Sequence, residues 1–178
     1  NLRVLKVKKS KELLPYAKDM FNVLNVAYRD IFGFVPLTDK QVDLYVKQYF
    51  GFIRPDYISI VLDKNDRVVA FAITMPSLSK ALQKSNGRLF PFGFIYILKA
   101  MKKNNLIDLY LIGVLPEYQG KGVNSILIKE LNKIFINKNI VSIETNPELE
   151  TNFKVQAQWK HFTHRQHKRR RCYIKQLY

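Results

Sequence analysis

The sequence predicts a mixed α/β fold, and two observations support this prediction. Short runs of β-branched and aromatic residues alternate with longer stretches in which apolar residues recur every three or four positions. These segments follow one another in the order β-α-α-β-β-(helical insert)-β-α-β-α-β. With 178 residues, 47% hydrophobic and 25% charged, the chain suits one globular domain over residues 1–178. Because it begins at Asn1, without a methionine, excision from a longer chain is an open alternative.

The first third of the chain predicts a strand and two helices. Residues 2–7 alternate basic and apolar side chains, as a strand does. Ser10 is expected to cap a helix whose buried face comprises Leu13, Ala17, Met20, Leu24 and Ala27. Residues 38–41, Thr-Asp-Lys-Gln, have the form of a capping box, so a second helix starts there and ends at Gly51. Its buried face would comprise Val42, Tyr45, Val46 and Tyr49.

The middle of the chain predicts a β-hairpin and then a helical insert. Residues 57–62 and 67–74 are rich in β-favouring residues, and the polar residues 63–66 between them predict the turn. Residues 77–105 are helical in tendency, with an interruption at Asn86-Gly87. An aromatic cluster lies in this insert, namely Phe90, Phe92, Phe94 and Tyr96. Such clusters are most often buried core or a docking face; a lid over a substrate or a homodimer surface are the alternatives.

The most informative stretch, residues 108–135, predicts a strand, a tight turn and an amphipathic helix. The strand covers residues 108–114 and stops before Pro116. The helix would bury Val123, Ile126 or Leu127, Leu131, and Ile134 or Phe135. Between strand and helix, Gly120 and Gly122 allow the backbone N–H groups to turn inward, and the helix dipole and Lys121 favour an anion. An ordinary strand-to-helix connection is the alternative.

The last quarter of the chain predicts a strand, a helix and a final strand. Residues 140–145 form a short apolar strand, and Asn146-Pro147 fits a helix N-cap followed by proline. That helix would bury Leu149, Phe153, Gln156 and Trp159. Residues 164–178 are expected to form a basic turn and a strand over residues 170–177. The basic cluster is either a solvated turn that guards a sheet edge or a contact for an anion.

Charge and cysteine content limit the classes of partner and compartment. The net charge of +16 permits nucleic acid, anionic lipid or polyphosphate as partners. Cys172, the one cysteine of the sequence, excludes an internal disulfide and fits a reducing cytoplasm. The longest apolar run, around residues 89–98, is shorter than the roughly 20 residues that a transmembrane helix needs. The three histidines lie within a cationic segment, so no metal site is expected.

The turn at residues 114–124 resembles the acyl-CoA signature of the GNAT superfamily of N-acyltransferases, Gln/Arg-x-x-Gly-x-Gly/Ala. Gln119 and Gly122 match the signature, and Asn124 stands where the family has Gly or Ala. The element order is also similar to that of the family. The resemblance implies a mixed, mostly antiparallel, twisted sheet with helices on both faces and a helical insert between the third and fourth strands. It further implies acetyl-CoA or another acyl-CoA as co-substrate and an amine of a small molecule or protein as acceptor.

The resemblance implies individual residue roles as well. In the family the fourth strand splays from the fifth, and the pantetheine arm pairs with it. This role falls here on Ile112, Gly113 and Val114. The pyrophosphate would bind the backbone of Gln119, Gly120, Lys121, Gly122, Val123 and Asn124. Asn152 begins the counterpart of the family's pattern Asn-x-x-Ala-x-x-x-Tyr and is expected as a further cofactor contact.

The catalytic groups that the resemblance implies are Asp108 and Tyr110. Asp108 stands where many relatives carry a glutamate base, and strand alternation predicts that Asp108 and Tyr110 share a face with Ile112 and Val114. A solvated or capping aspartate is the alternative. Trp159 stands where the family has its general-acid tyrosine, and an indole is not a general acid. Tyr110, His161 or a water would then supply the proton.

Two other functions remain open for the sequence. The tryptophan and Asn124 favour a catalytically degenerate acyl-CoA-binding domain. The net charge and the basic cluster favour a nucleic-acid-binding or membrane-surface module, whose polyanion affinity would fall steeply with salt.

Overall fold

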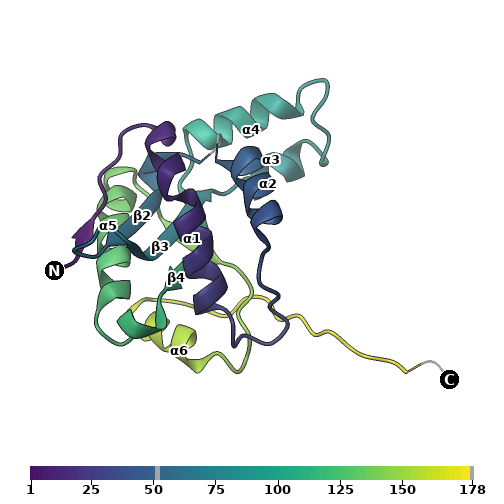
Figure 1. Ribbon diagram of the computed structural model, residues 1–178. Helices are drawn as coiled ribbons and strands as arrows, with labels where there is room; N and C mark the ends of the chain where they lie inside the picture. The colour runs from purple at the N-terminus through teal and green to yellow at the C-terminus, as the bar shows by residue number, and fades with distance from the viewer. Residues whose placement is uncertain (51–52, 177–178) are drawn as a thin grey trace. The chain divides into compact units, whose positions relative to one another are not determined.

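The computed structural model of the chain describes residues 1–50 and 53–176 (Figure 1). The chain divides into two units, Asn1–Glu144 and Thr145–Tyr178. The expected helix end at Gly51 lies outside the described residues. Within the described ranges, no helix has the length and hydropathy needed to span a membrane.

The first unit alternates strands and helices in the predicted order. Its N-terminal half contains β1 (Arg3–Val4), the 3-10 helix η1 (Ser10–Leu13), α1 (Leu14–Ala27), α2 (Asp39–Tyr49), η2 (Pro55–Tyr57), β2 (Ile58–Leu62) and β3 (Val68–Pro76). Its second half contains α3 (Ser79–Lys84), α4 (Gly93–Lys102), β4 (Leu106–Val114), η3 (Pro116–Tyr118) and α5 (Val123–Asn137). β5 (Ser142–Thr145) follows at the boundary between the two units.

The strands form one sheet in the order β1-β2-β3-β4-β5. The first four strands pair antiparallel with one another, so the expectation of a mixed α/β fold with a mostly antiparallel sheet is confirmed. Asp63 forms the predicted hairpin turn, because its Oδ1 accepts hydrogen bonds from the backbone N–H groups of Asn65 (2.8 Å) and Arg67 (3.0 Å).

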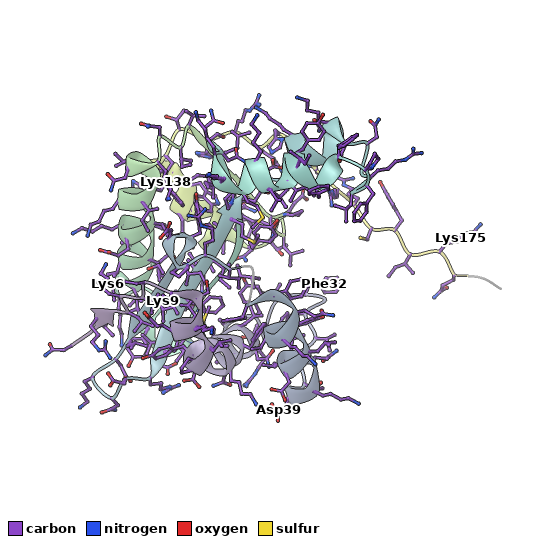
Figure 2. The ribbon with its side chains drawn as sticks, turned by 90° about the horizontal axis from the view of Figure 1, so that it is seen from above. Lys6, Lys9, Phe32, Asp39, Lys138 and Lys175 are labelled. Carbon is purple, nitrogen blue, oxygen red and sulfur yellow. The ribbon has the colours of Figure 1, made fainter. Side chains whose placement is uncertain are left out.

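Helices cover both faces of the sheet, with α1 and α2 on one side and α5 on the other (Figures 1 and 2). The predicted apolar face of α5 is confirmed, because the residues that it buries are Val123, Leu127, Leu131 and Phe135. Helix α1 buries Ala17, Met20, Val23 and Leu24, of which only Val23 was not predicted. Burial of these apolar faces against the sheet is the main source of stability.

Helix α2 begins at the predicted capping box. Gln41 N–H donates to Thr38 Oγ1 (3.4 Å), and Thr38 N–H donates to Gln41 Oε1 (2.9 Å). The predicted buried face is only partly correct. Val42 is the buried residue of this helix, and Tyr49 is 57% exposed.

The helical insert between β3 and β4 is confirmed as the pair α3 and α4. The predicted interruption lies where expected, since Asn86 and Gly87 have φ angles of 50° and 73° and end α3. Of the two main interpretations of the aromatic cluster, buried core is excluded, because Phe90, Phe92 and Phe94 are 78%, 66% and 41% exposed. They lie in the loop before α4 and on α4, where the described residues leave them largely uncovered, so a docking face, a lid or a homodimer surface stays open.

The second unit contains α6 (Phe153–Gln156) and η4 (Ala157–His161) and differs from the prediction at both ends. The helix starts at Phe153, not after Asn146, because Asn152 Oδ1 accepts from Val155 N–H at 3.4 Å and caps it there. Phe153 is therefore 72% exposed instead of buried. The expected strand over residues 170–177 is not formed in its described part, since a strand requires a hydrogen-bonded partner and residues 170–176 have none assigned.

An ion pair joins the N-terminal segment to α5 and should make stability depend on pH. Glu130 accepts hydrogen bonds from Lys133 Nζ (2.6 Å) and from Lys6 Nζ, and these lower the pKa of Glu130 from 4.5 to about 2. Because the pKa of Glu130 is lower in the folded than in the unfolded state, the ionised carboxylate stabilises the folded state above pH 4.5. This contribution disappears as the pH falls toward 2. Because both lysines are largely exposed, we expect it to amount to about 1 kcal/mol.

The substitution Glu130→Gln should therefore lower the melting temperature at pH 7, and the difference from wild type should shrink as the pH falls from 4.5 to about 2. Thermal denaturation followed by circular dichroism measures this. Glu117→Gln is the matched control, because Glu117 makes only a longer, exposed contact with Arg67 (3.4 Å). A melting-temperature difference that stays constant over this pH range would contradict the assignment.

Candidate functional site

A β-bulge in β4 shapes the candidate site. Thr74 of β3 lies opposite Leu109, whereas the preceding Ile73 lies opposite Leu111. Tyr110 is thus the extra residue of β4, between the two stretches of regular pairing. Bulges of this kind bend a strand and change the direction of the side chains that follow.

Because of the bulge, the prediction that Asp108 shares a face of β4 with Ile112 and Val114 is wrong. Asp108 lies opposite Met75 and Ile112 lies opposite Ala72, and these partners are three positions apart on β3. Residues an odd number apart on a strand point to opposite faces, so Asp108 does not share a face with Ile112 and Val114. It lies instead on the face of Gly113, which α1 covers. Simple alternation failed because the extra residue inverts the pattern.

Tyr110 and Asp108 lie near enough to interact electrostatically. Tyr110 is 40% exposed, and both partial burial and the charge of Asp108 raise the pKa of its phenol above the ordinary value. Burial is the larger of the two causes. The phenol is therefore protonated at neutral pH and has a proton to donate.

Some residues of β4 direct their backbone N–H and C=O groups toward β3, and others direct them toward the opposite edge of the strand. Leu115 N–H donates to Val69 O (2.9 Å), so Leu115 and, by alternation, Gly113 face β3. Ile112 and Val114 face the opposite edge. There Tyr28 Oη donates to Ile112 O (2.9 Å), and Gln119 Nε2 donates to Val114 O (3.1 Å). Both carbonyls thus accept hydrogen bonds from side chains.

Glycine at position 113 is a packing requirement. A Cβ added there would lie 3.0 Å from Phe71 Cε1 and 3.4 Å from Val23 Cγ1. Phe71 and Val23 are both buried, so neither can move aside easily. The glycine lets α1 lie close to the bulged strand.

The turn between β4 and α5 has the backbone conformation that the sequence predicts. Gly120 and Gly122 have φ angles of 72° and 76°. Gly122 is the N-cap of α5 and supplies no side chain to the first-turn N–H groups; the first helical hydrogen bond runs from Ile126 N–H to Gly122 O (3.3 Å). A Cβ at either glycine would meet nothing within 4 Å, so the space beside the turn is open. The exposed Lys121 lies between the two glycines.

Two predicted positions lie in the second unit and have local partners there. Asn152 caps α6, as described above. Trp159 Nε1 donates to Glu148 Oε1 at 2.9 Å, and its ring lies 6.2 Å from that of Phe162. The indole therefore has a structural role, as a hydrogen-bond donor to a carboxylate.

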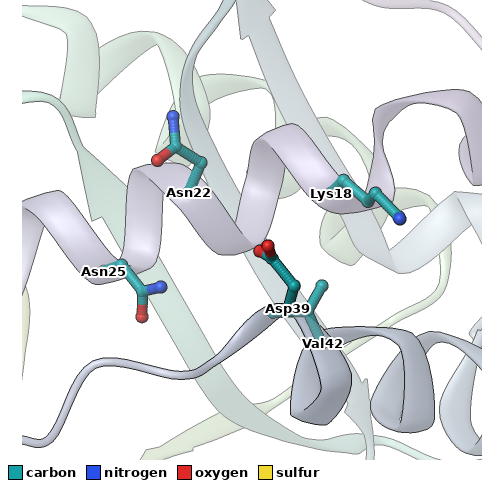
Figure 3. Close-up of a pocket in the computed structure, with 5 residues that line it drawn as sticks. All are labelled: Lys18, Asn22, Asn25, Asp39 and Val42. Atoms are coloured by element: carbon teal, nitrogen blue, oxygen red, sulfur yellow. The ribbon is translucent and has the colours of Figure 1, made fainter.

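A shallow polar pocket between α1 and α2 contains none of the predicted site residues. Its lining residues are Lys18, Asn22, Asn25, Asp39 and Val42 (Figure 3). Its volume of about 80 Å³ is room for roughly two or three waters. Asn25 exchanges two hydrogen bonds with the backbone of Leu37 (2.8 and 2.9 Å) and so fixes the connection between the helices. We infer a structural role for this pocket.

Sequence reasoning missed Tyr28, whose hydroxyl bonds to the edge of β4. The two residues lie 84 positions apart, so no local pattern could have linked them. The signal available in the sequence was only an aromatic residue with a polar tip next to the end of a predicted helix.

The sequence of the chain matches a family model and a curated protein. The model of the acetyltransferase (GNAT) family matches residues 17–162. Protein YghO of Escherichia coli (strain K12) is 28% identical over 161 residues, which are 87% of this chain and 41% of that protein. The chain thus spans about two fifths of the length of this relative.

Solved structures share the fold at low identity. An integron cassette protein from the mobile metagenome of V. cholerae has a TM-score of 0.61 at 17% identity, covering 98% of this chain and 92% of that one. The aminoglycoside N-acetyltransferase AAC(6')-Iy, solved with CoA, has a TM-score of 0.55 at 14% identity, covering 98% and 93%. These likenesses agree with the strand order, the helices and the family model. The chain belongs to the acetyltransferase (GNAT) family.

Proposed function

We propose that this chain is an acyl-CoA-dependent N-acyltransferase that transfers an acyl group, in the simplest case acetyl, to an amine of a small molecule or protein. The observation that carries the proposal is the open turn of Gly120 and Gly122 at the start of α5, next to the bulged β4. Family membership and the likeness to an acetyltransferase solved with CoA support it.

The cofactor would bind along the end of β4 and the start of α5. The pyrophosphate would accept hydrogen bonds from N–H groups of residues 119–124, favoured by the helix dipole and Lys121. The pantetheine arm would pair with the backbone of Ile112 and Val114, which face away from β3. Gly113 contributes by allowing the close approach of α1 rather than through its own backbone.

The acyl transfer itself needs a base and an acid. Asp108, directly or through one water, would take a proton from the incoming ammonium group so that the neutral amine attacks the thioester carbonyl. As the tetrahedral intermediate collapses, the C–S bond breaks and Tyr110 gives its phenolic proton to the leaving thiolate. The raised pKa of Tyr110 keeps that proton available at neutral pH. The nitrogen of the intermediate still carries one excess proton, which passes through water to the Tyr110 phenolate and restores the phenol. Asp108 releases the first proton to solvent.

The position of Asp108 also indicates the side from which the acceptor would come. Asp108 lies on the face of β4 that α1 covers, opposite Met75 of β3. We therefore expect the amine to approach from the α1 side of the sheet and the acyl-CoA from the edge of β4 that faces away from β3. Delivery of the two reactants from different directions allows both to meet at the bulge.

A catalytically inactive acyl-CoA-binding domain is the second candidate. The hydrogen bond from the Trp159 indole to Glu148 favours it, because the family's general-acid position is used here for a structural contact. The two candidates share the cofactor site and differ only in turnover.

The substitution Gly122→Val tests the cofactor site. A branched side chain at a φ of 76° is strained and projects into the open space where the pyrophosphate would bind. We expect acetyl-CoA binding to weaken by about tenfold or more, which is about 1.4 kcal/mol. Isothermal titration calorimetry measures the affinity.

Gly87→Val is the matched control, because Gly87 has a similar φ of 73° and equally open surroundings but lies in the insert. It should lose comparable stability and retain the affinity for acetyl-CoA. Unchanged affinity in folded Gly122→Val protein would remove the cofactor site from the proposal.

The substitution Asp108→Asn tests the base. We expect the turnover with an amine substrate to fall by roughly 10²–10⁴-fold while the affinity for acetyl-CoA is retained. The residual activity should rise with pH, as more of the amine becomes neutral. A thiol-detection assay of released CoA over a panel of amines measures both effects.

Asp66→Asn is the control for this experiment, since Asp66 pairs with Arg3 in the exposed hairpin turn and should leave turnover unchanged. Wild-type turnover of the Asp108→Asn protein at neutral pH would exclude Asp108 as the base. Tight acetyl-CoA binding without release of CoA for any amine would establish the inactive binding domain instead.

A further inference from the structure

The insert presents an exposed apolar surface that the proposed acyl transfer does not use. Six residues at the α3–α4 connection and on the first turns of α4 form this surface, which we call the insert tip: Leu89, Phe90, Phe92, Phe94, Ile95 and Leu98. Their exposed fractions range from 41% for Phe94 to 78% for Phe90. A contiguous run of this kind marks an interaction surface, whereas single exposed apolar residues do not.

The insert tip is the outermost part of the insert. Figures 1 and 2 both show α3 and α4 side by side, reaching away from the sheet, with their connecting loop at the far end. Phe90 and Phe94 lie with their ring centroids 6.1 Å apart, so the loop and the first turn of α4 form one continuous surface. The tip therefore projects from the unit instead of lining a depression between elements.

The insert that carries the tip is positively charged. Residues 77–107 contain six basic residues and no carboxylate side chain, the basic residues being Lys80, Lys84, Arg88, Lys99, Lys102 and Lys103. Lys84 Nζ lies 5.0 Å from the ring centroid of Tyr96 and so joins α3 to α4 beside the tip. Any partner that covers the tip must therefore tolerate several positively charged side chains next to the apolar contact.

The charges of α4 lie at a defined distance behind the apolar residues. Lys99 follows Ile95 by four positions and Lys102 follows Leu98 by four, so each lysine lies on the same side of the helix as its apolar neighbour. Four residues of helix correspond to roughly 6 Å along the axis. If the tip entered the boundary between lipid headgroups and acyl chains, these ammonium groups would lie at the level of the headgroups.

We propose that the insert tip binds an anionic lipid surface, with the aromatic and aliphatic side chains inserted among the lipids and the lysines in contact with the headgroups. Aromatic and aliphatic residues on one side and lysines close by are the pattern of interfacial segments. Attraction between juxtaposed basic residues and anionic lipids adds to the apolar contribution. A fluid surface also needs no complementary shape, which suits a protruding tip.

The charge distribution disfavours a second copy of the chain as the occupant. Two tips in contact would bring two sets of six cations together, without a carboxylate in either insert to offset the repulsion.

Vesicle flotation with the full chain tests the proposal. The wild type should float with vesicles of phosphatidylcholine and phosphatidylserine, and only weakly with vesicles of phosphatidylcholine alone. The double substitution Phe92→Ser with Leu98→Gln should lower the partition coefficient for the anionic vesicles by about tenfold or more, because it removes two exposed apolar side chains from the tip. Both side chains are largely exposed, so the variant should fold and melt as the wild type does.

The matched control is Phe32→Ser with Val35→Gln, which removes side chains that are 88% and 77% exposed in the α1–α2 connection (Figure 2). This variant should retain wild-type vesicle binding. Absence of vesicle binding by the wild type, or equal losses in the two variants, would overturn the proposal. A wild-type dimer that the tip variant converts to a monomer, without vesicle binding, would assign the tip to a second copy.

Discussion

The pairing of β4 with β3 is the constraint on which the candidate site depends. One extra residue, Tyr110, separates two stretches of regular pairing and determines which face each neighbouring side chain occupies. It places Asp108 on the side of α1, while Ile112 and Val114 direct their carbonyls to the edge that faces away from β3, where Tyr28 and Gln119 donate to them. The same strand leads through η3 into the glycine turn and α5. The proposed base, acid, pantetheine edge and phosphate turn thus all lie within 17 consecutive residues, 108–124, which a single bulge orients.

The elements that local chemistry determines could be predicted from the sequence. The capping box at Thr38, the positive φ at Gly120 and Gly122, and the apolar face of α5 each depend on residues within a few positions of one another. The bulge could not be predicted, because it depends on the register between two strands that a long insert separates. Asp108 was therefore expected on the wrong face. The contact of Tyr28 with β4 was missed for the same reason: it joins distant parts of the chain.

The end of the chain was predicted less well. The helix was expected to start at Asn146-Pro147, but it starts after Asn152, whose side chain accepts a hydrogen bond from Val155 N–H. The basic run before Cys172 was expected to turn into a strand, but successive cations repel each other and no neighbouring strand pairs with them in the described residues. The insert shows a related effect. Its aromatic residues were compatible with core or with a docking face on hydrophobicity alone, and the two short helices leave three of them largely exposed in the described structure.

The central claim is that acyl-CoA binds at the start of α5 and along the end of β4, on the edge that faces away from β3. It is tested most directly by amide hydrogen exchange, measured by NMR with and without acetyl-CoA. The account predicts slower exchange for Ile112, Val114 and the first turn of α5 when acetyl-CoA is bound. The amide of Gly113 provides an internal reference, because it faces β3 and should exchange slowly in both conditions. Unchanged exchange at the β4 edge and at the α5 turn, under conditions in which acetyl-CoA is bound, would contradict the claim.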